Sequence, residues 1–345
     1  MFSPNQEGFW GNPHVCEALA HMVDQGRLAQ TLLFSGPEGV GKATLARRLG
    51  AHLLGHPELI ERDDLSLPEN LETIATRERL APDKRNDDPL MFATHPDFVT
   101  FAPDGPLRQI SIPQTRKIKD LAQFAPHRGS RRVFLIDRVD RANEQAANSL
   151  LKTLEEPPAH LILIMTAQNA YDLLPTIRSR SVPFHFAPLS RPEMEAFVRA
   201  RGLDQPERRV SLAAGSPGIA VSLDLETYDK RRAAMLMLLK VAAGATPFAQ
   251  WAPVAEAIGR TRSEKLDAYL KVLYEVLRDL LLVHEGAAEI RNQDIRRDLE
   301  EIARRVGFPW IRAATKRIDE IAEFAQRNIQ KSIALDALIT ELRAA

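Results

Sequence analysis

Three glycines and a lysine form the clearest chemical pattern in the sequence. The stretch GPEGVGK has the GxxxxGK spacing of a phosphate-binding loop, with candidate binding residues Gly36, Gly39, Gly41 and Lys42. Glycines allow backbone N–H groups to turn inward around a phosphate, and a helix that starts after the loop favours an anion. An apolar run at 31–35 precedes the loop, and a helical pattern at 43–54 follows it. This context predicts a loop that binds nucleotide phosphates.

The residue after the lysine does not fit a working nucleotide hydrolase. Such loops place Ser or Thr there because the hydroxyl group holds the magnesium ion. This chain has Ala43 instead, and Thr44 lies one position further along. That offset rotates the hydroxyl by roughly a third of a helical turn, so Thr44 does not simply substitute. Nucleotide binding stays compatible with the loop, whereas an ordered magnesium ion is not expected.

A second carboxylate site is also incomplete. Asp137 ends an apolar run at 132–137 that is typical of a buried parallel strand, which suits a metal-binding carboxylate. The next position, where a hydrolase has a glutamate to position water, is Arg138. Asp140 is an alternative base, but we favour its interpretation as a carboxylate at a helix N-terminus. Ala43 and Arg138 therefore affect both halves of the same chemistry, which predicts a site that does not hydrolyse ATP.

Strands and helices alternate in the part of the chain that must position these residues. This alternation predicts βαβ units around a parallel sheet. The stretch 55–95 is rich in proline and weakly periodic, so it is expected to be an insertion, partly loop. Apolar runs predict strands at 31–35, 98–101, 132–137 and 161–165, and periodic patterns predict helices at 15–26, 43–54, 113–124 and 146–154.

From residue 191 onward the pattern is helical. We expect an α/β domain with a phosphate loop at 1–187, a small helical lid at 188–222 and an all-α domain at 223–345. A long apolar face from Leu270 to Leu281 marks the last of these. The fold class predicted is therefore a parallel α/β domain followed by a helical lid and a helical domain.

Composition limits the other possibilities. The 345 residues include 46 Lys and Arg against 46 Asp and Glu, whereas a protein that binds DNA by itself usually has a basic excess. Any DNA contact is therefore expected to be shared with partners. No apolar run reaches the roughly 18 residues of a membrane helix, and no signal segment is evident, so we expect a cytoplasmic protein. Cys16 stands alone, which excludes an internal disulfide and a cysteine-rich zinc site.

Two further motifs resemble those of bacterial clamp-loader subunits of DNA polymerase III, which are AAA+ proteins. ANSLLKTLEEPP at 147–158 is similar to one family signature, and LPTIRSR at 174–180 is similar to another. The resemblance extends over about 11–218, and the C-terminal third matches only in length and helical character. It implies an AAA+ domain, a lid and an oligomerising helical collar, and the lost site residues resemble the delta-prime type.

The resemblance also implies roles for individual residues. Arg180 corresponds to the arginine finger, which reaches the phosphates bound by a neighbouring subunit; the alternative is a surface arginine at a junction between elements. Gly218 occupies the place of the sensor-2 arginine of motor subunits, and sensor 1 lies within 166–168 without a single assignment. Many relatives carry zinc-binding cysteines after the phosphate loop, but this chain has none between 55 and 95, so no metal is expected.

The function implied is that of a non-hydrolysing subunit of the sliding-clamp loader within DNA polymerase III, itself a DNA-directed DNA polymerase. Its partners would be the other subunits of a heteromeric ring, with the sliding clamp and primed DNA reached through the complex. ATP or ADP can occupy its degenerate site without being hydrolysed. Two alternatives remain open: a working AAA+ ATPase such as the motor subunit, and an unrelated P-loop kinase or transport ATPase.

Overall fold

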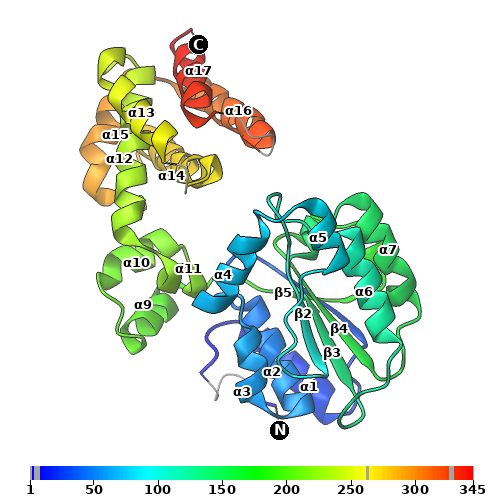
Figure 1. Ribbon diagram of the computed structural model, residues 1–345. Coiled ribbons are helices and arrows are strands. Elements are labelled where there is room, and N and C mark those ends of the chain that lie inside the picture. The colour runs from blue at the N-terminus through cyan, green and yellow to red at the C-terminus, as the bar shows by residue number, and fades with distance from the viewer. Residues whose placement is uncertain (1, 4–7, 262–263, 326–329, 345) are drawn as a thin grey trace. The chain divides into compact units, whose positions relative to one another are not determined.

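The chain folds into two compact units, 1–221 and 222–345 (Figure 1). The structure, a computed structural model, describes residues 2–3, 8–261, 264–325 and 330–344. The finer division into three domains, with a boundary at 187, stays a prediction.

The first unit is built on a sheet of five parallel strands in the order β2-β3-β4-β1-β5. Every residue of the first four strands is buried, as expected where both faces of a parallel sheet are covered. The fifth strand was not predicted, because it is short and contains Pro183. Proline cannot donate a ladder hydrogen bond, which restricts it to an edge such as the one this strand forms. The strands are β1 (Thr31–Ser35), β2 (Phe98–Phe101), β3 (Arg132–Ile136), β4 (Leu161–Ala167) and β5 (Val182–His185).

Helices cover both faces of this sheet (Figure 1). Neighbouring residues of β1 show the alternation, since Phe34 packs in the core beneath α1 and α2, and Leu33 packs in the core beneath α6 and α7. Burying side chains of this size stabilises the fold by about 2 kcal/mol each. Cys16 is buried in the first core, and burial raises the pKa of its thiol to about 11. The helices are α1 (Pro13–Asp24), α2 (Lys42–Leu54), α6 (Ile112–Ala122) and α7 (Glu144–Glu155).

The proline-rich stretch 55–95 contains more helix than its composition suggests. Three of its four prolines, Pro57, Pro68 and Pro82, stand at the first turn of α3, α4 and α5, where a missing N–H costs nothing, so they start helices instead of interrupting them. The remainder is turn and loop, as expected. The helices are α3 (Pro57–Ile60), η1 (Glu61–Asp63), α4 (Pro68–Arg77) and α5 (Pro82–Asp87).

A small helical group ends the first unit. It has its own core, formed by Leu189, Met194, Phe197, Val198 and Val210 with two alanines. Its helices are α9 (Arg191–Ala200), α10 (Pro206–Ala213) and α11 (Pro217–Ser222).

The second unit is helical in the part that the structure describes. Asp279 is fully buried there and accepts hydrogen bonds from the backbone N–H groups of Arg291 and Asn292, at 3.1 and 2.9 Å, and from the Asn292 amide at 2.8 Å. No described helix is long and apolar enough to cross a membrane. The helices are α12 (Leu225–Ala242), α13 (Ala252–Arg260), α14 (Leu266–His284), α15 (Arg296–Ala303), α16 (Phe308–Ala325) and α17 (Lys331–Ala344).

Candidate functional site

The predicted phosphate loop connects β1 to α2 and turns on its three glycines. Gly36, Gly39 and Gly41 have φ angles of 147°, 77° and 98°, which residues with a side chain rarely adopt. A Cβ atom at Gly36 would overlap the carbonyl oxygen of Phe186, and one at Gly41 would lie 2.8 Å from the Phe9 ring. The glycines are therefore required both by the turn and by the close packing around it.

Lys42 is the first residue of α2, and its side chain folds back over the loop. Its Nζ atom donates hydrogen bonds to the carbonyl oxygens of Gly36 and Pro37, each at 2.6 Å. The residue is only 7% exposed, and burial lowers the pKa of Lys42 to about 8, against the opposing effect of Asp137. The ammonium group is thus bound by the loop itself, and a phosphate would have to compete with two carbonyl groups for it.

Asp137 lies just past the end of β3, where the carboxylate was predicted. Its Oδ1 atom accepts a 2.6 Å hydrogen bond from the Thr166 hydroxyl, which in turn accepts from the backbone N–H of Arg138 at 2.8 Å. Burial raises the pKa of Asp137, and the hydrogen bond from Thr166 opposes that change. Within the stretch 166–168, the structure thus singles out Thr166 as the partner of this carboxylate.

Sequence reasoning could not select Thr166 because the choice depends on strand register. Ile136 of β3 lies opposite Met165 of β4, so the residues that follow them, Asp137 and Thr166, become neighbours. A polar residue near the end of an apolar strand was the available signal, but it does not determine which residue lies opposite it.

Arg138 and Asp140 form an ion pair with each other. The Arg138 Nε and Nη2 atoms lie 3.1 and 3.0 Å from the Asp140 carboxylate oxygens. Arg138 also has a left-handed φ of 58°, at the residue that precedes η2. Asp140 lies in the first turn of the short helix η2 (Val139–Arg141), where a helix N-terminal carboxylate was favoured, and it also pairs with the Arg138 guanidinium. A base neutralised in this way is poorly suited to activate water.

The start of α11 closes against the phosphate loop. The Gly218 N–H donates to the carbonyl oxygen of Gly39 at 2.8 Å. A Cβ atom at Gly218 would lie 3.0 Å from both the Cα and the O atom of Gly39, and one at Gly39 would lie 2.9 Å from the backbone nitrogen of Ile219. The position compared with a sensor-2 arginine therefore has no side chain, and its backbone contacts the loop directly.

Arg180 lies between α8 (Pro175–Arg178) and β5. In the part of the chain that the structure describes, its hydrogen bonds and ion pair involve neither the phosphate loop nor Asp137. Its Nη2 atom forms an ion pair with Glu155 Oε1 at 2.7 Å, and its Nη1 atom donates to the Thr176 carbonyl oxygen at 3.0 Å. The side chain is 34% exposed. The structure thus brings Lys42, Asp137 and Thr166 into one site, while Arg180 is bound by the ends of α7 and α8.

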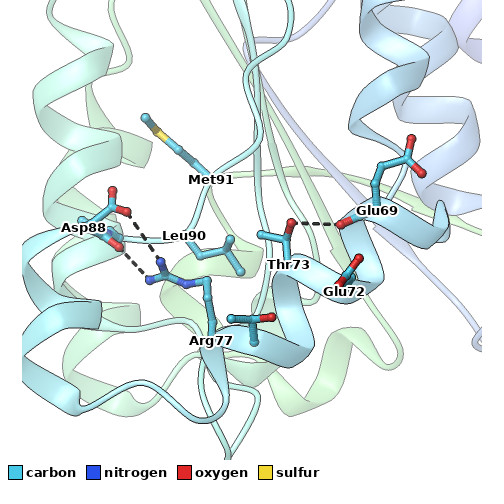
Figure 2. Close-up of a pocket in the computed structure, with 9 residues that line it drawn as sticks. Glu69, Glu72, Thr73, Arg77, Asp88, Leu90 and Met91 are labelled. Atoms are coloured by element: carbon cyan, nitrogen blue, oxygen red, sulfur yellow. Dashed lines mark hydrogen bonds and ion pairs between the residues drawn. The ribbon is translucent and has the colours of Figure 1, made fainter.

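A separate cavity of about 500 Å³ lies in the 55–95 insertion (Figure 2) and was not foreseen from the sequence. It shares no residue with the phosphate loop. The Arg77 guanidinium on its wall donates to the Asp88 carbonyl oxygen at 2.6 Å and pairs with Asp104 at 2.7 Å. The Thr73 hydroxyl donates to the Glu69 carbonyl oxygen at 2.9 Å. The Arg77 guanidinium and the Thr73 hydroxyl therefore both form hydrogen bonds with other residues of this chain. Among the described residues, no group of three or more His, Cys, Asp and Glu could hold a metal ion.

Comparison with known proteins finds similarity to subunits of DNA polymerase III. The family described as "DNA polymerase III, delta subunit" matches residues 84–190. DNA polymerase III subunit tau of Salmonella typhimurium is 32% identical over 221 residues, which cover 62% of this chain and 31% of that one. DNA polymerase III subunit delta′ of Escherichia coli is 29% identical over 254 residues, covering 72% and 73%. A solved gamma subunit-related protein from Thermotoga maritima aligns with a TM-score of 0.39 and 18% identity, over 95% of this chain and 98% of that one.

The sequence matches indicate the class of protein. They support a clamp-loader subunit of DNA polymerase III, of the AAA+ family, with similarity to the delta′ and tau/gamma subunits. An unrelated P-loop kinase or transport ATPase is therefore the wrong interpretation. The chain spans about a third of the length of the tau relatives, and about three quarters of the E. coli delta′ subunit.

Proposed function

We propose that this chain is a non-hydrolysing, delta-prime-like subunit of the sliding-clamp loader in DNA replication. It contributes ring geometry and a trans-acting arginine finger, Arg180, to the nucleotide site of a neighbouring ATPase subunit. The observation that carries the proposal is a contrast within one unit: the chain's own phosphate loop is closed on itself, and Arg180 is partly exposed.

Several features of the loop and its surroundings argue against ATP hydrolysis by this chain. Lys42 is held by two loop carbonyl groups, and charge-assisted hydrogen bonds of this kind contribute about 1.5–3 kcal/mol each. Gly218 binds the Gly39 carbonyl group and brings the lid onto the loop. Ala43 has no hydroxyl group for magnesium, and Arg138 replaces the water-positioning glutamate. ATP or ADP binding remains compatible with Gly36, Gly39, Gly41, Lys42 and Asp137, but turnover requires groups that these positions lack.

Arg180 has the properties that a trans-acting finger needs. Its guanidinium is planar and permanently charged, and it can donate two parallel hydrogen bonds to a phosphate. The ion pair that holds it in the free subunit lies at the surface, where such pairs contribute only about 0–1 kcal/mol. Arg180 can therefore leave Glu155 at little energetic cost and bind a phosphate on a neighbouring subunit.

The proposed partners follow from the same function. The other clamp-loader subunits would assemble with this chain into a heteromeric ring through the helical unit 222–345. The sliding clamp and primed DNA would be reached through the complex, in agreement with a net charge of zero.

A working ATPase is the second candidate, and a specific observation favours it. The tau and gamma/tau subunits are among the matches, and Lys42 and Asp137 are retained here. Steady-state ATP turnover by the isolated chain, with and without primed DNA, separates the two candidates. We expect no significant turnover. A rate near 1 per second, as in working phosphoryl-transfer enzymes, that disappears in Lys42→Ala would make the chain a motor subunit.

A further inference from the structure

Arg180 is held in a defined place by the end of another helix. Glu155 is the last residue of α7, and its Oε1 atom lies 2.7 Å from Arg180 Nη2. The Thr176 carbonyl oxygen accepts from Nη1 at 3.0 Å, and the Ser179 hydroxyl lies 3.4 Å from the same nitrogen. Both terminal nitrogens of the guanidinium are thus engaged within the chain.

The position of Glu155 has an electrostatic cost that the arginine relieves. A helix C-terminus carries a partial negative charge, so an anionic side chain is unfavourable there and a cation beside it is favourable. The side chains of Glu155 and Arg180 are 47% and 34% exposed, so water screens the pair and keeps it weak. The pair is therefore ordered in the free subunit and still easy to separate.

We propose that Glu155 is a positioning residue that holds Arg180 in a parked state and competes for it with the neighbouring subunit's nucleotide phosphate. This inference rests on the proposed function. In the parked state both terminal nitrogens are occupied, and the Glu155 carboxylate would repel an approaching phosphate. On engagement, Arg180 exchanges the carboxylate for a phosphate of higher charge, and Glu155 returns to water.

Parking has a defined kinetic consequence. It lowers the population of released Arg180, so the apparent affinity for ATP at that interface falls by the same factor. Once ATP is bound and Arg180 has engaged it, Glu155 no longer acts, and the turnover rate at saturating ATP is unaffected. Loss of the Glu155 charge should therefore lower KM without changing kcat, which is the signature of a change in uniform binding. The strength of an exposed ion pair sets the change at about two- to fivefold.

The test uses the reconstituted clamp-loader complex with primed DNA, and measures ATP hydrolysis against ATP concentration. With Glu155→Gln in this subunit, KM for ATP should fall about two- to fivefold, with kcat unchanged. Glu155→Ala should behave alike, because it removes the same carboxylate. Raising the salt concentration should bring the wild-type KM toward that of the variant, since salt screens the exposed pair.

Glu156 provides the matched control. It is the neighbouring, exposed carboxylate at the end of α7, and it forms no ion pair with the described residues. Glu156→Gln removes the same charge from the same helix end and should leave KM unchanged. Equal effects of Glu155→Gln and Glu156→Gln, or a lower kcat in Glu155→Gln, would overturn the parking role.

The Arg180→Ala background separates this inference from the proposed function. If Arg180→Ala alone has no effect on hydrolysis by the complex, the arginine finger itself is wrong. If Arg180→Ala reduces hydrolysis, the finger stands, and the effect of Glu155→Gln must then disappear in the double variant. A fall in KM that persists without Arg180 would show that Glu155 acts on something else.

Discussion

The phosphate loop and the segment around Arg180 lie in the same unit, yet their charged groups are arranged in opposite ways. At the loop, Lys42 is buried and bound by the loop's own carbonyl groups. At the other place, Arg180 is partly exposed and held by a half-exposed carboxylate. A buried cation bound by its own loop is costly to redirect, whereas an exposed one is not. The difference suggests that the nucleotide this chain serves lies on another subunit.

Removal of the helical unit 222–345 tests whether Arg180 acts within an assembled ring. This change has the largest expected effect, which is loss of complex formation. A chain that ends at residue 221 keeps its compact first unit but should lose complex formation with the other clamp-loader subunits in size-exclusion chromatography. If the shortened chain still co-elutes with them, the collar assignment of 222–345 is wrong.

A point variant sharpens this prediction. Phe308 is 50% exposed beside an apolar cavity of about 340 Å³ formed with Leu281 and Ile311, as an assembly surface would require. Phe308→Asp should weaken assembly. Phe248, which is 39% exposed and does not line this cavity, is the matched control, and Phe248→Asp should assemble normally.

Substitution of Arg180 tests the role of the partly exposed arginine in this comparison. Arginine fingers contribute about 10³ to 10⁵ in rate in well-studied GTPases, but only one interface of several is changed here. We therefore expect Arg180→Ala to lower DNA-stimulated ATP hydrolysis by the complex about two- to tenfold, with assembly intact. Arg180→Lys should restore little activity because an ammonium group cannot reproduce the guanidinium fork. Full activity in Arg180→Lys would point to simple charge attraction.

Substitution of a glycine in the phosphate loop tests how tightly the loop is packed. Gly36→Ala would place a Cβ atom against the Phe186 carbonyl group in a backbone conformation that disfavours any side chain. It should lower the free energy of unfolding by about 3 kcal/mol, measured by chemical denaturation. Gly129 also has a positive φ, of 70°, but nothing lies within 4 Å of its Cβ position. Gly129→Ala should therefore cost only about 1 kcal/mol, and equal losses would show that packing at the loop is unimportant.

These contrasts show what the sequence could and could not predict. The apolar runs of β1 to β4 predicted the sheet, because a strand buried on both faces is predominantly apolar. The edge strand β5 was missed, since Pro183 argues against a strand unless its edge position is known. The contact between Gly218 and Gly39 and the pairing of Arg180 with Glu155 join residues distant in sequence, so they depend on how helices and loops pack around the sheet.

The pH dependence of stability tests the burial of Lys42. Burial lowers its pKa from the usual 10.5 to about 8 in the folded chain. Between these values the unfolded chain holds the proton and the folded chain does not, so the free energy of unfolding rises with pH. From pH 8 to 10.5, wild type should gain up to about 3 kcal/mol relative to Lys42→Met, measured by urea denaturation. A difference that stays constant with pH would show that the ammonium group is well solvated.

The smallest expected effect is that of Lys42→Ala on the assembled complex. In a working ATPase this lysine binds the transferred phosphate, and its loss abolishes turnover. In this chain the ammonium group is bound by Gly36 and Pro37, and the neighbouring positions lack the groups that turnover needs. Lys42→Ala should therefore change DNA-stimulated hydrolysis and clamp loading by less than about twofold, far less than in a motor subunit. The measurement is made beside Arg180→Ala in the same reconstitution, so both variants share partners and DNA. If Lys42→Ala stops loading while Arg180→Ala has no effect, the two regions have exchanged roles, and the chain hydrolyses its own nucleotide.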